Sequence, residues 1–121
     1  MHYADTYALI EILKGNPNYS NYTLLVTSEF NLLELAYALR RDHPRSKALN
    51  ILETVRNDIL IVQPTDEDYI KAAEFKMEQK KKGRNVSLID ALGYVLAQRL
   101  RVPFLTGDPE FEDIENVEYV K

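Results

Sequence analysis

The chain of 121 residues contains no cysteine and no tryptophan, and it has only two histidines and four glycines. The lack of cysteine excludes disulfides, thiolate metal sites, iron–sulfur clusters and a cysteine nucleophile. His2 and His43 show no zinc-type spacing, which disfavours a zinc site and double-histidine catalysis. The glycines form neither G-x-G-x-x-G nor G-x-x-x-x-G-K, and no G-x-S-x-G elbow is present. The usual phosphate-binding loops and serine-hydrolase motif are therefore absent.

Long apolar runs are also missing from the sequence. No segment approaches the ~18 uninterrupted apolar residues of a membrane span, and residues 1–10 lack the basic and apolar regions of a secretory signal. We therefore expect a cytoplasmic protein with no membrane partner. The length and the 45% apolar content predict one globular domain over residues 1–121.

Negative charge is in slight excess, because 15 Lys and Arg stand against 19 Asp and Glu, for a net charge of −4. This balance disfavours a protein that coats nucleic acid. Basic residues nevertheless gather within residues 40–56 and 71–84. Such local basic segments suit either a small contact with a polyanion or solvated helix faces.

Short apolar segments alternate with helical patterns along the chain. Since parallel strands need helical crossovers, this alternation predicts an α/β fold, with a central, mostly parallel sheet between two helical layers. The predicted strands are His2–Ala4, Tyr22–Val26, Ile59–Val62, Val102–Thr106 and Val117–Val120. The predicted helices cover about 7–14, 29–41, 44–56, 66–82 and 88–100, with Ser28, Thr65 and Ser87 as N-caps.

Four carboxylates lack a neighbouring cation that would explain them. Glu34 and Asp90 lie within apolar helical segments, and Asp5 and Asp108 follow predicted strands. Burying an unpaired carboxylate costs several kcal/mol in practice. Separate structural roles remain open: a capping acid at Asp90, a surface acid at Glu34, and turn-forming residues at Asp5 and Asp108. One hypothesis covers all four, namely a cluster that holds Mg²⁺, which prefers oxygen ligands. A magnesium ion held in this way activates water for attack on phosphorus.

The four acids occur in the segments YADTYALIEIL, FNLLELAYAL, SLIDALGYVLA and FLTGDPEF. In this order they resemble the PIN-domain family and, more narrowly, its VapC-type ribonuclease toxins. The resemblance implies an endoribonuclease that depends on Mg²⁺ or Mn²⁺. Asp5, Asp90 and Asp108 would then be metal ligands, and Glu34 would hold a metal-bound water. The hydroxyls of Thr6 and Thr106 match positions that hydrogen-bond the carboxylates or the attacking water.

The resemblance also implies partners: an RNA substrate, a small antitoxin protein, and a second copy in a homodimer. Candidate contacts to RNA phosphates are Arg40, Arg41, Arg45, Lys80, Lys81, Lys82 and Arg84. The first predicted strand departs from the family pattern, since His2-Tyr3-Ala4 is short and partly polar. Two alternatives stand beside the nuclease: a PIN-like binding module without turnover, and a receiver-like phosphorylation domain.

Overall fold

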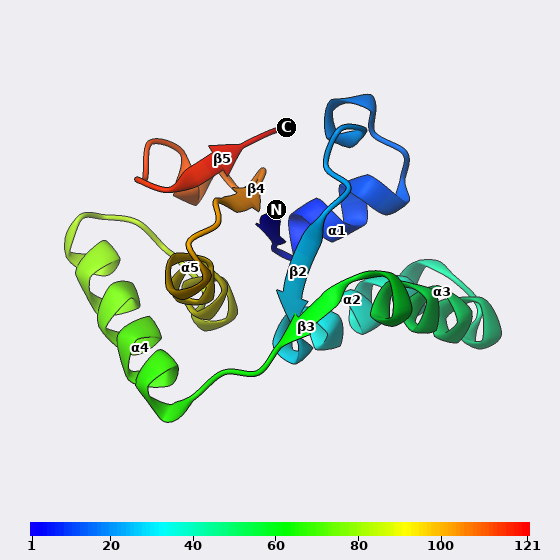
Figure 1. The fold of residues 1–121 in the computed structure, drawn as a ribbon, viewed down its shortest axis with the longest axis horizontal. Coiled ribbons are helices and arrows are strands. Elements are labelled where there is room, and N and C mark those ends of the chain that lie inside the picture. The colour runs from blue at the N-terminus through cyan, green and yellow to red at the C-terminus, as the bar shows by residue number, and fades with distance from the viewer.

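The computed structural model describes all 121 residues and contains one five-stranded sheet in which every pair of neighbouring strands is parallel. The strand order is β3-β2-β1-β4-β5 (Figure 1). The strands are β1 (His2–Ala4), β2 (Leu25–Ser28), β3 (Leu60–Val62), β4 (Phe104–Thr106) and β5 (Val117–Tyr119). This order differs from the 2-1-3-4-5 order of receiver-type folds, so the receiver-like alternative is wrong.

The helices are α1 (Thr6–Leu13), α2 (Glu29–Asp42), α3 (Arg45–Asp58), α4 (Asp66–Lys81) and α5 (Leu88–Leu100). Two short 3₁₀ helices cover Pro17–Tyr19 and Pro109–Phe111. α1, α2 and α3 cover one face of the sheet, and α4 and α5 pack together on the other (Figure 1). The three-layer α/β/α fold predicted from the sequence is therefore confirmed. None of these helices is both long and apolar enough to cross a membrane.

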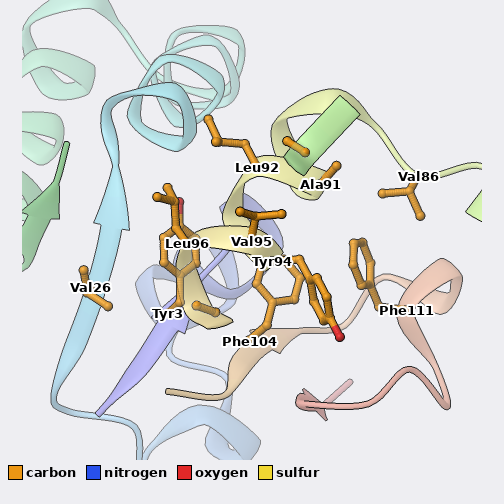
Figure 2. Packing of buried hydrophobic residues seen from close by; sticks show 12 residues of the cluster. Tyr3, Val26, Val86, Ala91, Leu92, Tyr94, Val95, Leu96, Phe104 and Phe111 are labelled. Atoms are coloured by element: carbon orange, nitrogen blue, oxygen red, sulfur yellow. The ribbon is translucent and has the colours of Figure 1, made fainter. Parts of the chain in front are cut away.

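The strands supply both halves of the core by alternation. Tyr3 and Phe104 point toward α5, whereas the next residues, Ala4 and Leu105, join the core on the α1 and α2 side. This period of two is the ordinary geometry of a strand buried on both faces. The ring of Phe104 packs against Phe111, with centroids 4.8 Å apart (Figure 2).

Helix α5 lies close to the sheet, and residues Ala91–Ala97 are all buried as a result. A side chain at Gly93 would place its Cβ 2.8 Å from the Tyr3 ring and 3.0 Å from the Phe104 ring. Glycine is therefore the residue that allows α5 to approach the central strands. The close approach also fixes the N-terminal turn of α5, which carries Asp90.

Three strands begin later than the sequence predicts, β3 by one residue, at Leu60 in place of Ile59. The expected strand Tyr22–Val26 is wrong at its start, because Tyr22 closes a turn on Tyr19 and β2 begins only at Leu25. The expected strand Val102–Thr106 begins instead at Phe104. The Val102 N–H still bonds to Ala97 O at the end of α5, and the following proline has no N–H to offer a neighbouring strand.

The partly polar strand β1 is central, and its polar groups are satisfied. The Tyr3 hydroxyl donates to Asn31 Oδ1 at 2.6 Å. His2 Nε2 lies 2.9 Å from Glu118 Oε1, and the His2 ring packs edge-on against Tyr22. These contacts remove the cost of burying polar atoms, which explains why a strand of this composition lies in the middle of the sheet.

Candidate active site

The four predicted acids line one cleft of about 670 Å³. Asp5 follows β1 and Asp108 follows the neighbouring strand β4, so both lie at the carboxyl edge of the sheet. Glu34 projects from α2, and Asp90 projects from the first turn of α5. Four segments that are distant in sequence therefore contribute one carboxylate each. This edge is where parallel α/β sheets ordinarily bind ligands.

Asp5 is only 1% exposed, yet it forms no ion pair. Its Oδ1 accepts the Ala8 N–H at 2.8 Å, which caps α1, and its Oδ2 accepts the Thr106 hydroxyl. Burial and then the charge of Asp90 raise the pKa of Asp5 well above its ordinary value, against the lowering effect of these hydrogen bonds. The protein thus holds this carboxylate firmly without supplying a positive charge.

Asp90 is in a similar electrostatic position. Burial, followed by the charges of Glu34 and Asp108, raises the pKa of Asp90 to about 6. The N-cap bond of α5 runs from the Asp90 N–H to the Ser87 hydroxyl at 3.1 Å. The backbone of Asp90 therefore serves the cap, and its carboxylate is not the capping group.

Glu34 is held by a chain of hydrogen bonds that starts in the core. Asn31 accepts from the Tyr3 hydroxyl and donates to Thr6 Oγ1 at 3.1 Å. Thr6 in turn donates to Glu34 Oε1 at 2.7 Å. Asn31 is fully buried and was missed as a site residue by the sequence analysis. The available signal was a polar residue three positions before Glu34, within the mostly apolar segment 30–39 of α2.

Asp108 combines a turn-forming role with its place in the cleft. Its Oδ1 accepts the Glu110 N–H at 3.0 Å, and its own N–H donates to Thr106 Oγ1 at 3.0 Å. A Cβ at Gly107 would lie 2.1 Å from the Tyr7 ring and 2.5 Å from the Val120 carbonyl oxygen. The Thr106-Gly107-Asp108 turn therefore requires glycine at its centre. Asp5 and Asp108 therefore each have a local structural role, in the cap of α1 and in this turn, and both also line the cleft.

The donors in the cleft are carboxylate and hydroxyl oxygens, with no histidine or cysteine among them. No three acidic or histidine side chains are arranged to enclose a metal ion directly. A hard divalent cation such as Mg²⁺ takes oxygen ligands, keeps several waters and needs few protein ligands. The donor set fits such an ion, and positive charge would offset the burial and the carboxylate repulsion that together raise the pKa values of Asp5 and Asp90.

The basic residues named in the sequence analysis do not gather at one place. Arg41 is the single cation that lines the acidic cleft. Arg40 and Arg45 border a separate depression between α2 and α3. Arg84 donates to the carbonyls of Glu110 and Glu112, and Lys82 pairs with Glu78. Lys80 and Lys81 are exposed at the end of α4 and do not line the cleft.

Comparison with known proteins agrees with this geometry. The family model of the PIN domain matches residues 3–117, which is nearly the whole chain. The chain belongs to the PIN-domain family. The match includes all four acids of the cleft. No curated protein matches the chain.

Several solved structures share the PIN fold of this chain at low sequence identity. VapBC2 from Rickettsia felis, bound to a DNA fragment from its promoter, is 20% identical with a TM-score of 0.78, and all of both chains is covered. VapBC-1 from nontypeable Haemophilus influenzae is 19% identical with a TM-score of 0.76, covering 98% of this chain and 96% of that one. VapC20 from Mycobacterium tuberculosis, a toxin that cleaves the sarcin–ricin loop, is 17% identical with a TM-score of 0.75, covering 98% and 99%.

Proposed function

We propose that this PIN-domain protein is an endoribonuclease that depends on Mg²⁺ or Mn²⁺ and serves as the toxin of a toxin–antitoxin pair. One observation carries the proposal: four carboxylates from four separate segments line a cleft at the carboxyl edge of the sheet, and one of them is buried without a cation. Repulsion among these groups is unfavourable by itself. A divalent cation in the cleft would offset this repulsion and could in turn bind the negatively charged phosphodiester.

The structural relatives support the biological part of the proposal. Two of those described above are VapBC proteins and the third is an RNA-cleaving toxin. On this basis we propose RNA as the substrate and a small antitoxin as the partner. The cytoplasmic location, expected from the sequence, and the homodimer, implied by the resemblance, remain predictions.

In the proposed reaction, Asp5, Asp90 and Asp108 would hold the metal ion in part through its bound waters, because no three acidic side chains enclose an ion directly. When bound, such an ion lowers the pKa of water and neutralises charge on the phosphoryl oxygens. Thr106 and the Ala8 N–H fix both oxygens of Asp5, so its position does not depend on the ligand. Glu34 Oε1 accepts the hydrogen bond of the Thr6 hydroxyl, and no group of the protein donates to Glu34 Oε2. This free oxygen is available to orient the attacking water.

The test compares RNA cleavage by the wild type and by Asp90→Asn in Mn²⁺, with Asp66→Asn as the matched control. Asp66 is an exposed first-turn acid of α4 that does not line the cleft. We expect Asp90→Asn to lower the cleavage rate by about 10³-fold, in line with the loss of an essential charge at the reacting phosphate. Asp66→Asn should cleave at the wild-type rate. Undiminished cleavage by Asp90→Asn, or by the wild type in excess EDTA, would contradict the proposal.

A further inference from the structure

A second cavity, of about 420 Å³, shares no lining residue with the acidic cleft. Its walls are the C-terminal halves of α4 and α5 and the loop 112–116 that leads into β5. Phe75, Tyr94 and Ile114 are its apolar side chains, and the remaining lining residues are polar or charged. The proposed nuclease function uses none of these residues.

Gln79 is the side chain of this cavity that the fold leaves without a role. It is only 5% exposed, yet its amide forms no hydrogen bond within the protein. No fully enclosed polar side-chain atom of the protein lacks a hydrogen-bond partner, so the Gln79 amide opens into the cavity that it lines. Burying an amide without a partner costs free energy. The amide is therefore placed to bind a group from outside the chain.

The two cations of the cavity wall already have partners within the protein. Arg84 donates through Nη1 to the carbonyl oxygens of Glu110 and Glu112, at 2.9 and 2.8 Å. Lys82 donates through Nζ to Glu78 Oε1 at 3.3 Å. Neither cation thus stands free to receive an anion.

Two carboxylates of the same wall have no partner. Asp113 and Glu115 lie in the loop before β5, and neither side chain forms a hydrogen bond or an ion pair. Burial and then the charges of Glu115 and Glu78 raise the pKa of Tyr94, so both carboxylates lie near its hydroxyl. Either loop acid alone would be an ordinary solvated residue. Together with the oxygen of Gln79, they make the unpartnered groups of this cavity a set of acceptors.

From this set of free acceptors we infer that the cavity binds a small organic cation with an ammonium or guanidinium group. Such a group brings a positive charge and several N–H donors, which carboxylate and amide oxygens accept. The methylene groups of the ligand would lie against Phe75 and Ile114. A bare metal ion does not fit, because no three acidic or histidine side chains are arranged to enclose one. The volume lies in the range of small-molecule sites.

The test titrates the full chain with spermidine and with agmatine by isothermal titration calorimetry, in EDTA and at constant ionic strength. We expect saturable binding that weakens about tenfold in Asp113→Asn and in Glu115→Gln, because each loses a charged acceptor. Asn tolerates the positive φ of 70° at Asp113, so this variant keeps the loop. Gln79→Met retains the size of the buried side chain, removes the amide and should also weaken binding.

Glu112→Gln is the matched control, since Glu112 is an exposed acid of the same loop that does not line the cavity. Asp90→Asn removes a carboxylate from the acidic cleft alone, so it should bind both probes as the wild type does. Binding of agmatine alone would support a guanidinium site, and binding of spermidine alone an ammonium site.

Three results would overturn the inference: no saturable binding of either probe, equal affinity of the wild type and both loop variants, or loss of binding in Asp90→Asn. The inference does not depend on the nuclease proposal. A protein that binds a probe through Asp113 and Glu115 but cleaves no RNA in Mn²⁺ would keep this site and lose the nuclease function.

Discussion

Two buried aspartates in this protein have opposite electrostatic surroundings. Asp68 is 2% exposed and Asp5 is 1% exposed. Asp68 is bound by Arg99, with Nε to Oδ1 at 3.1 Å and a second guanidinium nitrogen to Oδ2 at 3.0 Å, and it completes the capping box of α4 with Thr65. Asp5 receives one hydroxyl and one backbone N–H, and no cation.

The pKa values of the two groups diverge accordingly. Burial acts to raise the pKa of Asp68, but the Thr65 N–H and the Arg99 guanidinium outweigh it and lower that pKa. For Asp5, burial prevails and the pKa is raised. The structural carboxylate of Asp68 is thus neutralised by a cation of the same chain, Arg99. The carboxylate of the cleft is kept in place by neutral donors, and under the proposed function a bound divalent cation would supply its counter-charge.

The largest effect is expected when the ion pair between Arg99 and Asp68 is broken. Arg99→Leu leaves Asp68 buried without its cation, so we expect a loss of about 2–3 kcal/mol in the free energy of unfolding, less than for a fully buried pair because the Arg99 side chain is 41% exposed. Urea denaturation measures this change. Asp5→Asn, by contrast, should lose no stability in metal-free protein, because the amide can accept the Ala8 N–H and Thr106 can accept from it. A large loss in Asp5→Asn and none in Arg99→Leu would reverse the comparison.

A smaller effect is the dependence of stability on pH in metal-free protein. The folded state raises the pKa of Asp90 to about 6 from 3.8, so it holds this proton where the unfolded chain has released it. Stability therefore falls as pH rises from about 4 to about 6, by at most about 3 kcal/mol and less because Asp90 is partly exposed. The raised pKa of Asp5 acts in the same direction.

Urea titrations at fixed pH values, with EDTA present, measure this dependence. Asp90→Asn should flatten the fall between pH 4 and 6. Asp68 has a lowered pKa, so its contribution to stability is present above pH 3.8 and lost below that value. Asp68→Asn should therefore lower stability at all pH values above 3.8 and flatten the acid limb, while the fall between pH 4 and 6 remains. A wild-type stability that rises steadily from pH 4 to 7 would contradict the assignment of uncompensated acids to the cleft.

Much of the site could be predicted because parallel strands dictate where their ends meet. Once Ala4 and Thr106 are recognised as the last residues of two parallel strands, Asp5 and Asp108 must lie at the same edge of the sheet. Glu34 and Asp90 were found because no cation stands within helical reach of either. These inferences depend on local patterns and on a general rule of topology, both of which the sequence carries.

What could not be predicted depends on contacts between distant segments. Arg84 looks like a phosphate contact within a basic run, but it binds carbonyls of a turn more than twenty residues away. Asn31 looks like any polar helix residue until Tyr3 and Thr6 meet it. Tyr22 opens an apolar segment of which only Leu25 and Val26 join β2, while Tyr22 itself closes a turn and packs against His2. Arg41 was separable from Arg40 by spacing, since only Arg41 shares the helix face of Glu34.

The central claim is that the acids of the cleft bind a divalent cation, and thermal unfolding with and without Mn²⁺ tests this claim most directly. At a concentration tenfold above its dissociation constant, an ion that binds only the folded state adds about 1.4 kcal/mol, or several degrees in Tm. We predict this rise for the EDTA-stripped wild type and for Asp68→Asn, and its loss in Asp90→Asn. An unchanged Tm of the wild type in millimolar Mn²⁺, or an equal rise in Asp90→Asn, would contradict the account.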